Sequence, residues 1–476
     1  MELSQQPDCS ALAQFTMPDV KVTEAVAVPA PSTGAVRVAH CKVSGTIGTE
    51  IRFTLILPDA WNHKFMMGGG GGFVAGIDNQ AIASANEGYA TVGTDTGHQG
   101  GVSLAGWALN NPERQLNFGH VAVHRVTEVS KAILRKHYGA NETYAYFSGC
   151  SNGGRQALME AQRYPDDYDG IVSGAPAYDF MGLGAQFIKD QQAVFPDPTN
   201  LKESILTNDV LKSVEAQVVE KCDAIDGVKD GLMEDPRACK VDVGTLTGLT
   251  DVQRAALKKV YGETRNKDGV IYPGQPFGGE SDAQGWPLWI VGANQLLLVS
   301  QNTPNLRFAF GTEMFKNFVF SNPEWNYSRY DFADFRKTTA KVGAMLNATD
   351  PNLDKFKAKG HKLVIWHGWA DPALTPLATI KYYDQVQARD KKVKDFARMF
   401  MMPGVLHCAG GAGPDRADWT KVIENWVEKG QAPERVVASK MSGGKAVRTR
   451  PLCVYPQHAV YSGTGSIDEE QNFVCK

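Results

Sequence analysis

The chain is 476 residues long, with 43% hydrophobic and 21% charged residues and a formal net charge of −3. This length exceeds the size at which a single hydrophobic core usually stops growing, so we expect two domains or one core with a large insertion. A nearly neutral charge without a Lys/Arg run disfavours nucleic acid and anionic membranes as partners. No apolar stretch approaches the roughly 20 residues that span a bilayer.

Eight cysteines are spread along the chain without a Cys-x-x-Cys pair, which argues against a zinc ribbon or a thioredoxin-like site. By position, the natural pairs are Cys9–Cys41, Cys222–Cys239 and Cys453–Cys475. This pattern indicates a disulfide framework in an oxidising compartment, against the alternative of eight buried free thiols. We therefore expect a secreted or periplasmic protein, and the missing charged-then-apolar leader is then explained by removal of a signal peptide.

Strands and helices alternate over the first 175 residues. Short apolar runs predict strands at 51–57, 64–67, 89–92, 143–147 and 170–172, and helical patterns cover 118–137 and 153–164. This alternation is typical of an α/β protein with a mostly parallel sheet.

From about residue 177 to about residue 349 the chain becomes polar and irregular, rich in Asn, Asp, Pro, Gly and aromatic residues. The earlier rhythm then resumes, with strands predicted at 362–366 and 398–402, a helix at 418–429 and a hairpin at 435–438 and 446–449. The simplest account is an α/β catalytic core formed by residues 1–176 and 351–476. Residues 177–350 would be a domain inserted into that core.

A candidate nucleophile lies in Gly149-Cys-Ser-Asn-Gly153, which fits the pattern Gly-x-Ser-x-Gly between a predicted strand and a predicted helix. There Ser151 would sit on a sharp turn, and the small residues Gly149 and Gly153 leave room for the chain to cross itself. The following helix N-terminus would place free N–H groups beside the hydroxyl. We predict that Ser151 is a nucleophile; the alternative is a tight turn with an inert serine.

Proteins built around this turn place the serine, the acid and the histidine in that order along the chain. His407 follows the strand at 398–402 in a Gly-rich loop and is the expected base. His367 ends the strand at 362–366 and is expected to be structural, whereas His98 precedes the serine and breaks the order.

The expected acid is Asp371, which follows the strand at 362–366 at the sheet edge where catalytic groups gather in open α/β sheets. Its carboxylate would accept a hydrogen bond from the histidine and hold one tautomer. Asp95 is the alternative acid. Asp395 and Asp415 are closer to the histidine along the chain and are expected to be surface charges.

Two cysteines flank these residues, because Cys150 precedes Ser151 and Cys408 follows His407. A serine nucleophile and its histidine base must lie within hydrogen-bond reach. If Ser151 and His407 are that pair, the neighbouring cysteines come close enough to bond, which requires α-carbons within about 7 Å. Such a disulfide would clamp the two loops that carry the chemistry.

Five glycines at 68–72 follow the strand at 64–67 and can expose backbone N–H groups. Phosphate binding is disfavoured, because the run has no Gly-Lys-Ser/Thr ending and no clean Gly-x-Gly-x-x-Gly helix start. The preferred interpretation is half of an oxyanion hole, with N–H donors from Gly72 and Asn152 that are each typically worth roughly 3–4 kcal/mol of barrier. The alternative is a flexible loop.

The segment from Cys222 to Cys239 is dense in oxygen ligands, with Asp223, Asp226 and Asp230 around glycines. These residues resemble a compact calcium loop, although their spacing differs from the EF-hand pattern. Hard oxygen ligands favour calcium over zinc, and the like charges would repel one another without a cation. The alternative is a polar Asp/Gly turn. Because the inserted domain follows the nucleophile helix, we expect it to act as a lid.

Over nearly its whole length the chain resembles the tannase/feruloyl esterase family. The motifs that carry this resemblance are Gly149-Cys-Ser-Asn-Gly-Gly-Arg155, the segment Tyr164 to Pro176, Trp366-His-Gly-Trp-Ala-Asp-Pro372 and Gly404-Val-Leu-His-Cys-Ala-Gly-Gly411. The resemblance implies an α/β-hydrolase core with a large inserted lid domain, and a disulfide between Cys150 and Cys408.

The resemblance also implies structural Ca²⁺ and no organic cofactor. The implied calcium ligands are the side chains of Asp223, Asp226 and Asp230 and the backbone carbonyls of Val228 and Leu232.

We therefore expect a secreted serine carboxylic-ester hydrolase that cleaves feruloyl, other hydroxycinnamoyl or galloyl esters, with the aromatic acid attached to plant polysaccharide or polyphenol. Phe73, Leu374 and aromatic residues between 308 and 330 are candidates for the substrate pocket. The chief alternative is a hydrolase of terephthalate monoesters. More remote alternatives are a non-catalytic secreted calcium- or carbohydrate-binding protein and a nucleotide-dependent enzyme that uses the glycine run.

Overall fold

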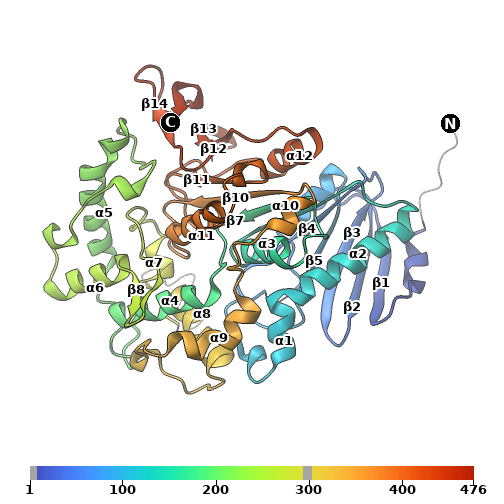
Figure 1. Cartoon of the computed structure of the whole chain (residues 1–476), viewed down its shortest axis with the longest axis horizontal. Coiled ribbons are helices and arrows are strands. Elements are labelled where there is room, and N and C mark those ends of the chain that lie inside the picture. The colour runs from blue at the N-terminus through green and yellow to red at the C-terminus, as the bar shows by residue number, and fades with distance from the viewer. Residues whose placement is uncertain (1–7, 75, 293–302) are drawn as a thin grey trace.

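A twisted mixed sheet forms the centre of the molecule in this computed structural model, which describes residues 8–74, 76–292 and 303–476 (Figure 1). Within those residues the sheet has nine strands in the order β1-β2-β3-β5-β4-β6-β7-β10-β11. β1, β2, β3 and β5 pair antiparallel, and every later pair, from β5 with β4 to β10 with β11, is parallel. Their bounds are β1 Val20–Val28, β2 His40–Ile47, β3 Ile51–Pro58, β4 Lys64–Gly68, β5 Ala90–Thr94, β6 Tyr144–Cys150, β7 Gly170–Gly174, β10 Lys362–Gly368 and β11 Ala397–Met402.

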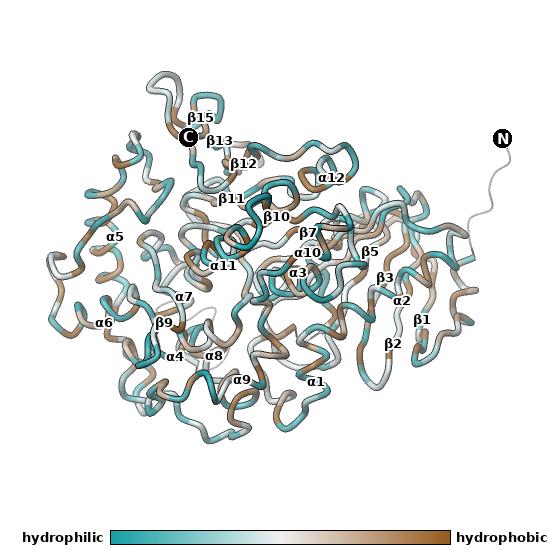
Figure 2. The backbone as a smooth tube through the Cα atoms, in the orientation of Figure 1, coloured by the Kyte–Doolittle hydropathy of each residue, from teal (hydrophilic) through white to brown (hydrophobic). Residues whose placement is uncertain are grey.

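Helices pack on both faces of the sheet, and side chains of its central strands are buried on both sides. Figure 2 colours the hydrophobic residues along the chain brown. Successive side chains of a strand point to opposite faces. Phe147 of β6 therefore packs in a core with helices α2, α3 and α11, whereas its neighbour Tyr146 packs in a second core with α12. The helices span α1 Pro112–Leu116, α2 Ala122–Tyr138, α3 Asn152–Arg163, α11 Pro376–Arg389 and α12 Trp419–Lys429.

The predicted α/β class is confirmed, and each strand and helix expected in the sheet region has a counterpart within a few residues. Of the nine strands of this sheet, those that the sequence analysis missed are β1, at the edge, and its neighbour β2. β1 has no fully buried side chain, and Lys21, Thr23 and Glu24 interrupt its valines and alanines.

The described part of the segment between β7 and β10 combines α-helices with long irregular connections, and the sequence analysis did not predict these helices. Its helices bury aromatic and aliphatic side chains in two further cores, which compensates for their many polar residues. In Figure 1 the helices α4 to α9 of this segment occupy the lower and left part of the view, and α10 lies near its centre. Its elements are α4 Phe180–Val194, α5 Asn208–Cys222, α6 Asp251–Tyr261, β8 Thr264–Asn266, β9 Gly269–Tyr272, α7 Trp286–Trp289, α8 Leu306–Glu313, α9 Phe335–Leu346 and α10 Asp354–Ala358. The domain boundaries at 176/177 and 350/351 stay a prediction.

Two small antiparallel pairs follow α12, and four disulfides link the chain. The first pair is the predicted hairpin, β12 (Arg435–Ser442) with β13 (Lys445–Cys453), and the second is β14 (Ala459–Tyr461) with β15 (Phe473–Cys475). The disulfides are Cys9–Cys41, Cys150–Cys408, Cys222–Cys239 and Cys453–Cys475, so all eight cysteines pair as expected.

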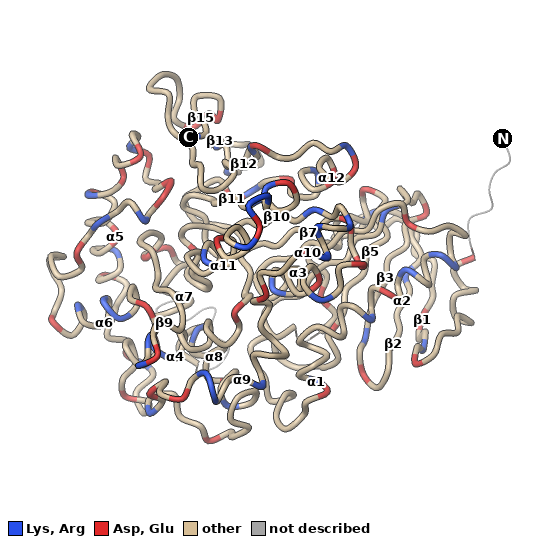
Figure 3. The backbone as a smooth tube through the Cα atoms, viewed as in Figure 1, with Lys and Arg blue, Asp and Glu red and all other residues tan. Residues whose placement is uncertain are grey.

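Charged side chains of both signs are interspersed along the chain rather than gathered by sign (Figure 3). In the described part of the chain, no helix is long and apolar enough to cross a membrane.

Candidate active site

Ser151 lies on a strained turn between β6 and α3. Its backbone has φ 66° and ψ −123°, and its N–H donates to the carbonyl of Gly174 over 3.0 Å. A non-glycine residue in such a conformation typically costs about 1–3 kcal/mol, which the surrounding contacts must offset. The turn needs glycine at Gly149 and Gly153, because a Cβ atom there would lie 2.7 Å from the Gly153 backbone and 2.5 Å from Gln80 Oε1, respectively.

His407 lies in the loop after β11 and contacts the serine directly. Its Nε2 atom is 2.8 Å from Ser151 Oγ, and its Nδ1 atom is 2.8 Å from Asp371 Oδ2. The three side chains therefore form a continuous hydrogen-bonded row. Its members come from the carboxyl-terminal ends of β6, β10 and β11, the sheet edge where reactive groups gather in α/β folds.

Asp371 is fully buried and is held by donors on every side. Its Oδ1 atom accepts from the N–H groups of Ala373 and Leu374 at 2.8 and 2.9 Å, and its Oδ2 atom lies 3.1 Å from His367 Nε2 as well as beside His407. Burial by itself would raise the pKa of Asp371, but attraction to His407 and hydrogen bonds from His367 and His407 outweigh it. The pKa of Asp371 is therefore below its ordinary value, and the carboxylate stays ionised beside the imidazole.

His367 forms no hydrogen bond with Ser151; it lies beside the carboxylate of Asp371 instead. Its Nδ1 atom is 2.8 Å from Thr379 Oγ1, and its Nε2 atom faces both Asp371 and the carbonyl of Leu374 at 3.1 Å. Because both partners of Nε2 are acceptors, this nitrogen carries a proton. The position fits the structural role expected for His367.

Asp95 and His98, the other acid and the other histidine considered from sequence, contact residues outside the Ser151–His407–Asp371 row. Asp95 accepts hydrogen bonds from Arg52 N–H, Gly97 N–H and the Gln99 amide. His98 stacks on Trp107 with ring centroids 3.6 Å apart.

Asp395 is exposed as expected, but the surface position expected for Asp415 is wrong. Its side chain is only 11% exposed, and its Oδ2 atom accepts from the N–H of Gly410 within the His407 loop.

The glycine run packs against the nucleophile turn. A Cβ atom on Gly69 would lie 2.7 Å from the Cα atom of Gly153, so the two loops touch through backbone atoms. The N–H groups of Gly70 and Gly71 donate to Gln156 Oε1 and Asp78 Oδ2, at 2.9 and 2.8 Å.

Gly72, at φ 51°, has no hydrogen bond from its N–H to any described residue. Asn152 opens α3, where the first N–H groups of a helix have no partner within the helix. Gly72 and Asn152 line the same cavity as Ser151, and neither N–H group has an acceptor among the described residues.

The side chain of Asn152 joins the glycine run to the helix. Its Nδ2 atom donates to the carbonyl of Gly70 over 2.9 Å, and its Oδ1 atom accepts from Arg155 Nε over 2.8 Å. Arg155 is fully buried, and its guanidinium donates further to the carbonyls of Phe118, Gly119 and Leu346. Burial lowers the pKa of Arg155 to about 9.

A cavity of about 350 Å³ opens beside the serine, within the range of about 300–1,000 Å³ typical of small-molecule sites. Phe73 and Leu374, both named from sequence, line it; of the aromatic residues between 308 and 330, Phe310 alone does so. None of the described lining residues carries a Lys, Arg, Asp or Glu side chain. The lining residues that the sequence analysis missed are Val102, Ser103, Ala177, Phe180, Leu183, Phe187, Trp289, Leu306, Met314 and Ala373.

The carboxylates of the proposed calcium loop bind their own backbone. Asp223 accepts from the N–H of Gly231 over 2.8 Å, Asp226 from that of Glu234 over 3.1 Å, and Asp230 pairs with Arg450. The donor types suit calcium, because three carboxylates lie in one short loop. Burial raises the pKa of Asp226, and repulsion from Asp230 and Asp223 adds to this shift, a strain that a cation would relieve. In the described part of the chain, however, the one trio of potential ligand atoms within 4.8 Å of one another lies elsewhere.

Known proteins resemble this chain over most of its length. A family model described as "Tannase and feruloyl esterase" matches residues 35–476. The mono(2-hydroxyethyl) terephthalate hydrolase of Piscinibacter sakaiensis is 32% identical, over 94% of this chain and 87% of that protein. A probable feruloyl esterase of Arthroderma benhamiae is 30% identical, over 100% of this chain and 94% of that protein.

Two solved structures share the architecture. Feruloyl esterase B from Aspergillus oryzae has a TM-score of 0.88 and 26% identity, over 98% of this chain and 99% of that one. The tannin acyl hydrolase from Aspergillus niger has a TM-score of 0.78 at 19% identity, over 100% and 95% of the two chains, and shows the shared fold. These likenesses confirm the predicted α/β-hydrolase type.

Proposed function

The chain belongs to the tannase and feruloyl esterase family and is a carboxylic ester hydrolase, and we propose that it cleaves esters of hydroxylated aromatic acids through Ser151, His407 and Asp371. The observation that carries this proposal is the hydrogen-bonded row of these three side chains at the mouth of an apolar cavity. Hydrolase activity rules out the non-catalytic alternative considered from sequence.

Acylation follows from the positions of the protons. His407 Nε2 takes the proton of Ser151 Oγ as this oxygen attacks the ester carbonyl carbon, and Asp371 stabilises the imidazolium that results. The tetrahedral intermediate collapses when His407 gives that proton to the departing alcohol, which leaves an acyl group on Ser151. Water then attacks the acyl group, again with His407 as base, and the acid is released with Ser151 restored.

Negative charge develops on the carbonyl oxygen during both steps, and the N–H groups of Gly72 and Asn152 are the donors we assign to it. Support comes from their position beside Ser151 in the cavity wall and from the lack of an internal acceptor for either group. Each such donor typically contributes roughly 3–4 kcal/mol. Asn152 has a second part in this proposal, because its side chain fixes the glycine run that presents Gly72.

The absence of charged side chains from the described cavity lining distinguishes between hydroxylated aromatic esters and terephthalate monoesters as substrates. A terephthalate monoester carries a second, ionised carboxylate, and burying it without a cation costs several kcal/mol. The described lining offers no cation, and residues 293–302, which lie outside the described residues, contain no Lys or Arg. This favours an uncharged aromatic acyl group, such as a feruloyl, other hydroxycinnamoyl or galloyl group.

A hydroxyl on the aromatic ring has a potential partner in Ser103. This side chain lines the cavity, is 1% exposed, and its Oγ atom has no hydrogen-bond partner among the described residues. A buried hydroxyl without a partner costs free energy that a phenolic substrate group would recover. Phe73 and Phe310, whose rings meet edge to face with centroids 5.1 Å apart, would flank the aromatic acid.

Residues 177–350 act as the lid in this proposal. They contribute Phe180, Leu183, Phe187, Trp289 and Phe310 to the cavity. The loop of Asp223, Asp226 and Asp230, with the carbonyls of Val228 and Leu232, would hold a structural calcium ion in this lid. The four disulfides support a location in an oxidising compartment, secreted or periplasmic. The alcohol part of the substrate would be plant polysaccharide or polyphenol.

A substrate panel tests the proposal. Methyl ferulate, methyl gallate, chlorogenate and a terephthalate monoester are compared for kcat/KM with the wild type and with Ser151→Ala. We expect hydrolysis of the hydroxylated aromatic esters at least about 10-fold faster than that of the terephthalate monoester, since even one unfavourable contact of 1.4 kcal/mol gives that factor. Ser151→Ala should abolish every activity. Turnover by this variant would refute the triad, and a preference for the terephthalate monoester would refute the substrate class.

A further inference from the structure

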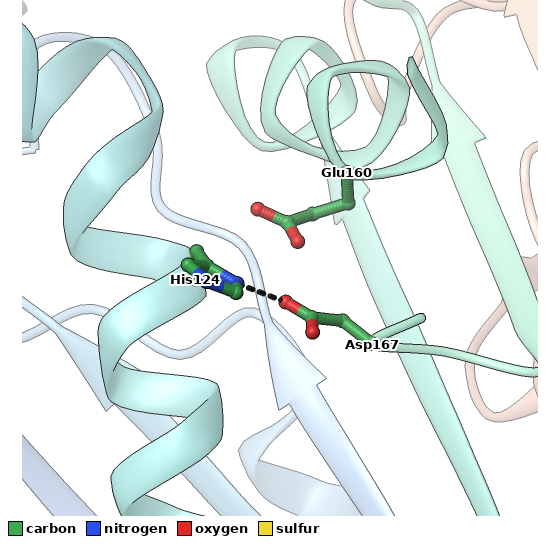
Figure 4. Close-up of side chains that lie close together, drawn as sticks. All are labelled: His124, Glu160 and Asp167. Carbon is green, nitrogen blue, oxygen red and sulfur yellow. Dashed lines mark hydrogen bonds and ion pairs between the residues drawn. The ribbon is translucent and has the colours of Figure 1, made fainter. Parts of the chain in front are cut away.

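A second cluster of ionisable side chains lies at the far end of the helix that begins beside the nucleophile. His124 of α2, Glu160 of α3 and Asp167 of the loop before β7 place one ligand atom each within 4.8 Å of one another (Figure 4). No other group of three His, Cys, Asp or Glu residues in the described ranges does so.

Glu160 is the unusual member of this trio. It is 1% exposed, and neither carboxyl oxygen has a hydrogen-bond partner in the structure. Figure 4 shows its carboxyl group extending from α3 toward His124 and Asp167. A buried carboxyl group without a partner is costly, so this site calls for a proton or a cation.

His124 is held in place by Asp167 and Tyr164, and a bound metal ion would replace the proton that its Nδ1 atom shares with Asp167. Its Nδ1 atom lies 2.7 Å from Asp167 Oδ2, and its ring stacks on Tyr164 with centroids 3.9 Å apart and planes 6° apart. The other ring nitrogen faces Glu128, with 3.7 Å between Nε2 and Oε1. Histidines that bind metal commonly have a carboxylate beside the second ring nitrogen, which fixes the tautomer and orients the ring.

We propose that His124, Glu160 and Asp167 bind one divalent first-row transition metal ion, with zinc as its reference member. One imidazole and two carboxylates suit zinc, manganese, iron or nickel, whereas calcium prefers oxygen ligands alone. Three protein ligands leave one coordination position for water. The side chain of His124 is 26% exposed and provides the route by which the ion enters.

The role of this ion is to join three segments. It links α2, α3 and the loop that leads into β7, and so anchors the end of α3 opposite the nucleophile. Glu160 is nine residues beyond Ser151, which corresponds to about 13 Å along a helix with a rise of 1.5 Å per residue. At that distance the ion touches no reacting atom, so its contribution is to stability.

Zinc binding to the metal-stripped full chain, in the presence of excess calcium, tests this proposal. Isothermal titration calorimetry with zinc chloride should show that the wild type binds one zinc ion tightly. Thermal unfolding should show that zinc raises the Tm of the wild type. Glu160→Gln, His124→Asn and Asp167→Asn should each weaken zinc binding by at least about 10-fold, the lower limit for lost metal-site partners. Glu160→Gln removes a charge without changing the shape, so it should fold even if another variant does not.

Asp166→Asn is the matched control, because Asp166 neighbours Asp167 in sequence but has a side chain that is 74% exposed. It should bind zinc as the wild type does. Equal zinc affinity in all the variants would place the ion elsewhere and overturn the proposal. A wild type that binds no zinc would overturn the proposal. If Glu160→Gln is then at least as stable as the wild type, the buried carboxyl group is accounted for by a proton shared between Glu160 and Asp167.

Discussion

Cys150 and Cys408 are joined by a disulfide whose α-carbons are 6.0 Å apart although 258 residues separate them along the chain. Each is bonded through the backbone to a residue of the hydrogen-bonded row, Ser151 on one side and His407 on the other. The Oγ to Nε2 distance of 2.8 Å between those residues therefore depends on two loops that are covalently tied. The disulfide thus restrains the distance on which proton transfer depends.

Replacing both cysteines, Cys150→Ala with Cys408→Ala, should lower stability and activity together. Loss of a native disulfide typically costs about 2–5 kcal/mol. We expect kcat, corrected for the folded fraction and measured well below Tm, to fall by at least about 10-fold, because an error of about 1 Å in a catalytic contact can cost 10²-fold. Thermal unfolding and steady-state kinetics on methyl ferulate measure the two effects.

The double variant Cys9→Ala with Cys41→Ala is the matched control. This disulfide closes 32 residues at the edge of the sheet, so Tm should fall while kcat stays at the wild-type value. The chain-entropy relation makes its loss about 2 kcal/mol less costly than that of Cys150–Cys408. Equal kcat in the two double variants would show that the central disulfide contributes to stability alone.

Asp371→Asn should lower kcat by about 10⁴-fold and leave KM nearly unchanged. An amide in this position can donate to His407 Nδ1 and so favours the wrong tautomer of the imidazole, as in other triads. Steady-state kinetics give both constants. The control is His367→Gln, which alters a partner of Asp371 but no atom in contact with Ser151. A loss in this control as large as that in Asp371→Asn would contradict the assignment of Asp371 as the acid next to the base.

The same carboxylate makes stability depend on pH. The pKa of Asp371 in the folded protein is below that of an unfolded aspartate, which is about 3.9. The stability that its ionised form contributes is therefore fully present above about pH 4 and is lost as the pH falls toward the lower, folded value. Denaturant unfolding at several pH values should show that the wild type's advantage over Asp371→Asn shrinks below about pH 4. A stability difference between the wild type and Asp371→Asn that grows as the pH falls would contradict a lowered pKa of Asp371.

The sequence predicted the parts of this site that short motifs define. Ser151 stands in a five-residue pattern, and the order of Asp371 and His407 along the chain follows the strand order, so the three could be named before their contact was known. The cavity lining could not be named, because it forms between segments far apart in sequence. Phe180, Leu183 and Phe187 share one face of α4 at helical spacing, but nearly every residue of α4 is buried, so the spacing does not single out the face that lines the cavity. Ser103 belongs to no sequence motif. It stands out only in the structure, where its hydroxyl is buried without a hydrogen-bond partner among the described residues.

Gly72→Ala should lower kcat by about 10²–10³-fold, the usual effect of losing one oxyanion donor. Gly72 has φ 51°, and a Cβ atom there would lie 2.8 Å from the carbonyl oxygen of Val102, so the backbone must move. Gly106→Ala is the control, because a Cβ atom at Gly106 meets nothing within 4 Å. A Gly72→Ala enzyme with wild-type kcat on methyl ferulate would remove Gly72 from the oxyanion hole.

In the zinc-free protein, calcium removal should lower Tm, and excess calcium should restore it. A ligand at 100 times its Kd stabilises the folded protein by about 2.7 kcal/mol. Asp226→Asn should abolish the response to chelator, whereas Asp268→Asn, in the exposed turn between β8 and β9, should keep it. Differential scanning calorimetry with EGTA and then excess calcium gives the shifts. If calcium does not change the Tm of the wild type, this loop is a polar turn and not a calcium site.

Ser103→Ala should change substrate selectivity rather than general activity. If Ser103 Oγ binds the phenolic hydroxyl, its removal costs a hydrogen bond of about 1 kcal/mol for methyl ferulate and methyl p-coumarate and nothing for methyl cinnamate, which lacks that hydroxyl. The ratio of kcat/KM for p-coumarate to that for cinnamate should therefore fall about 5-fold. Val102→Ala is the neighbouring control, because Val102 lines the same cavity with an apolar side chain; it should affect both esters alike. A parallel loss on both esters in Ser103→Ala would mean that the hydroxyl of Ser103 has no part in recognising the ring.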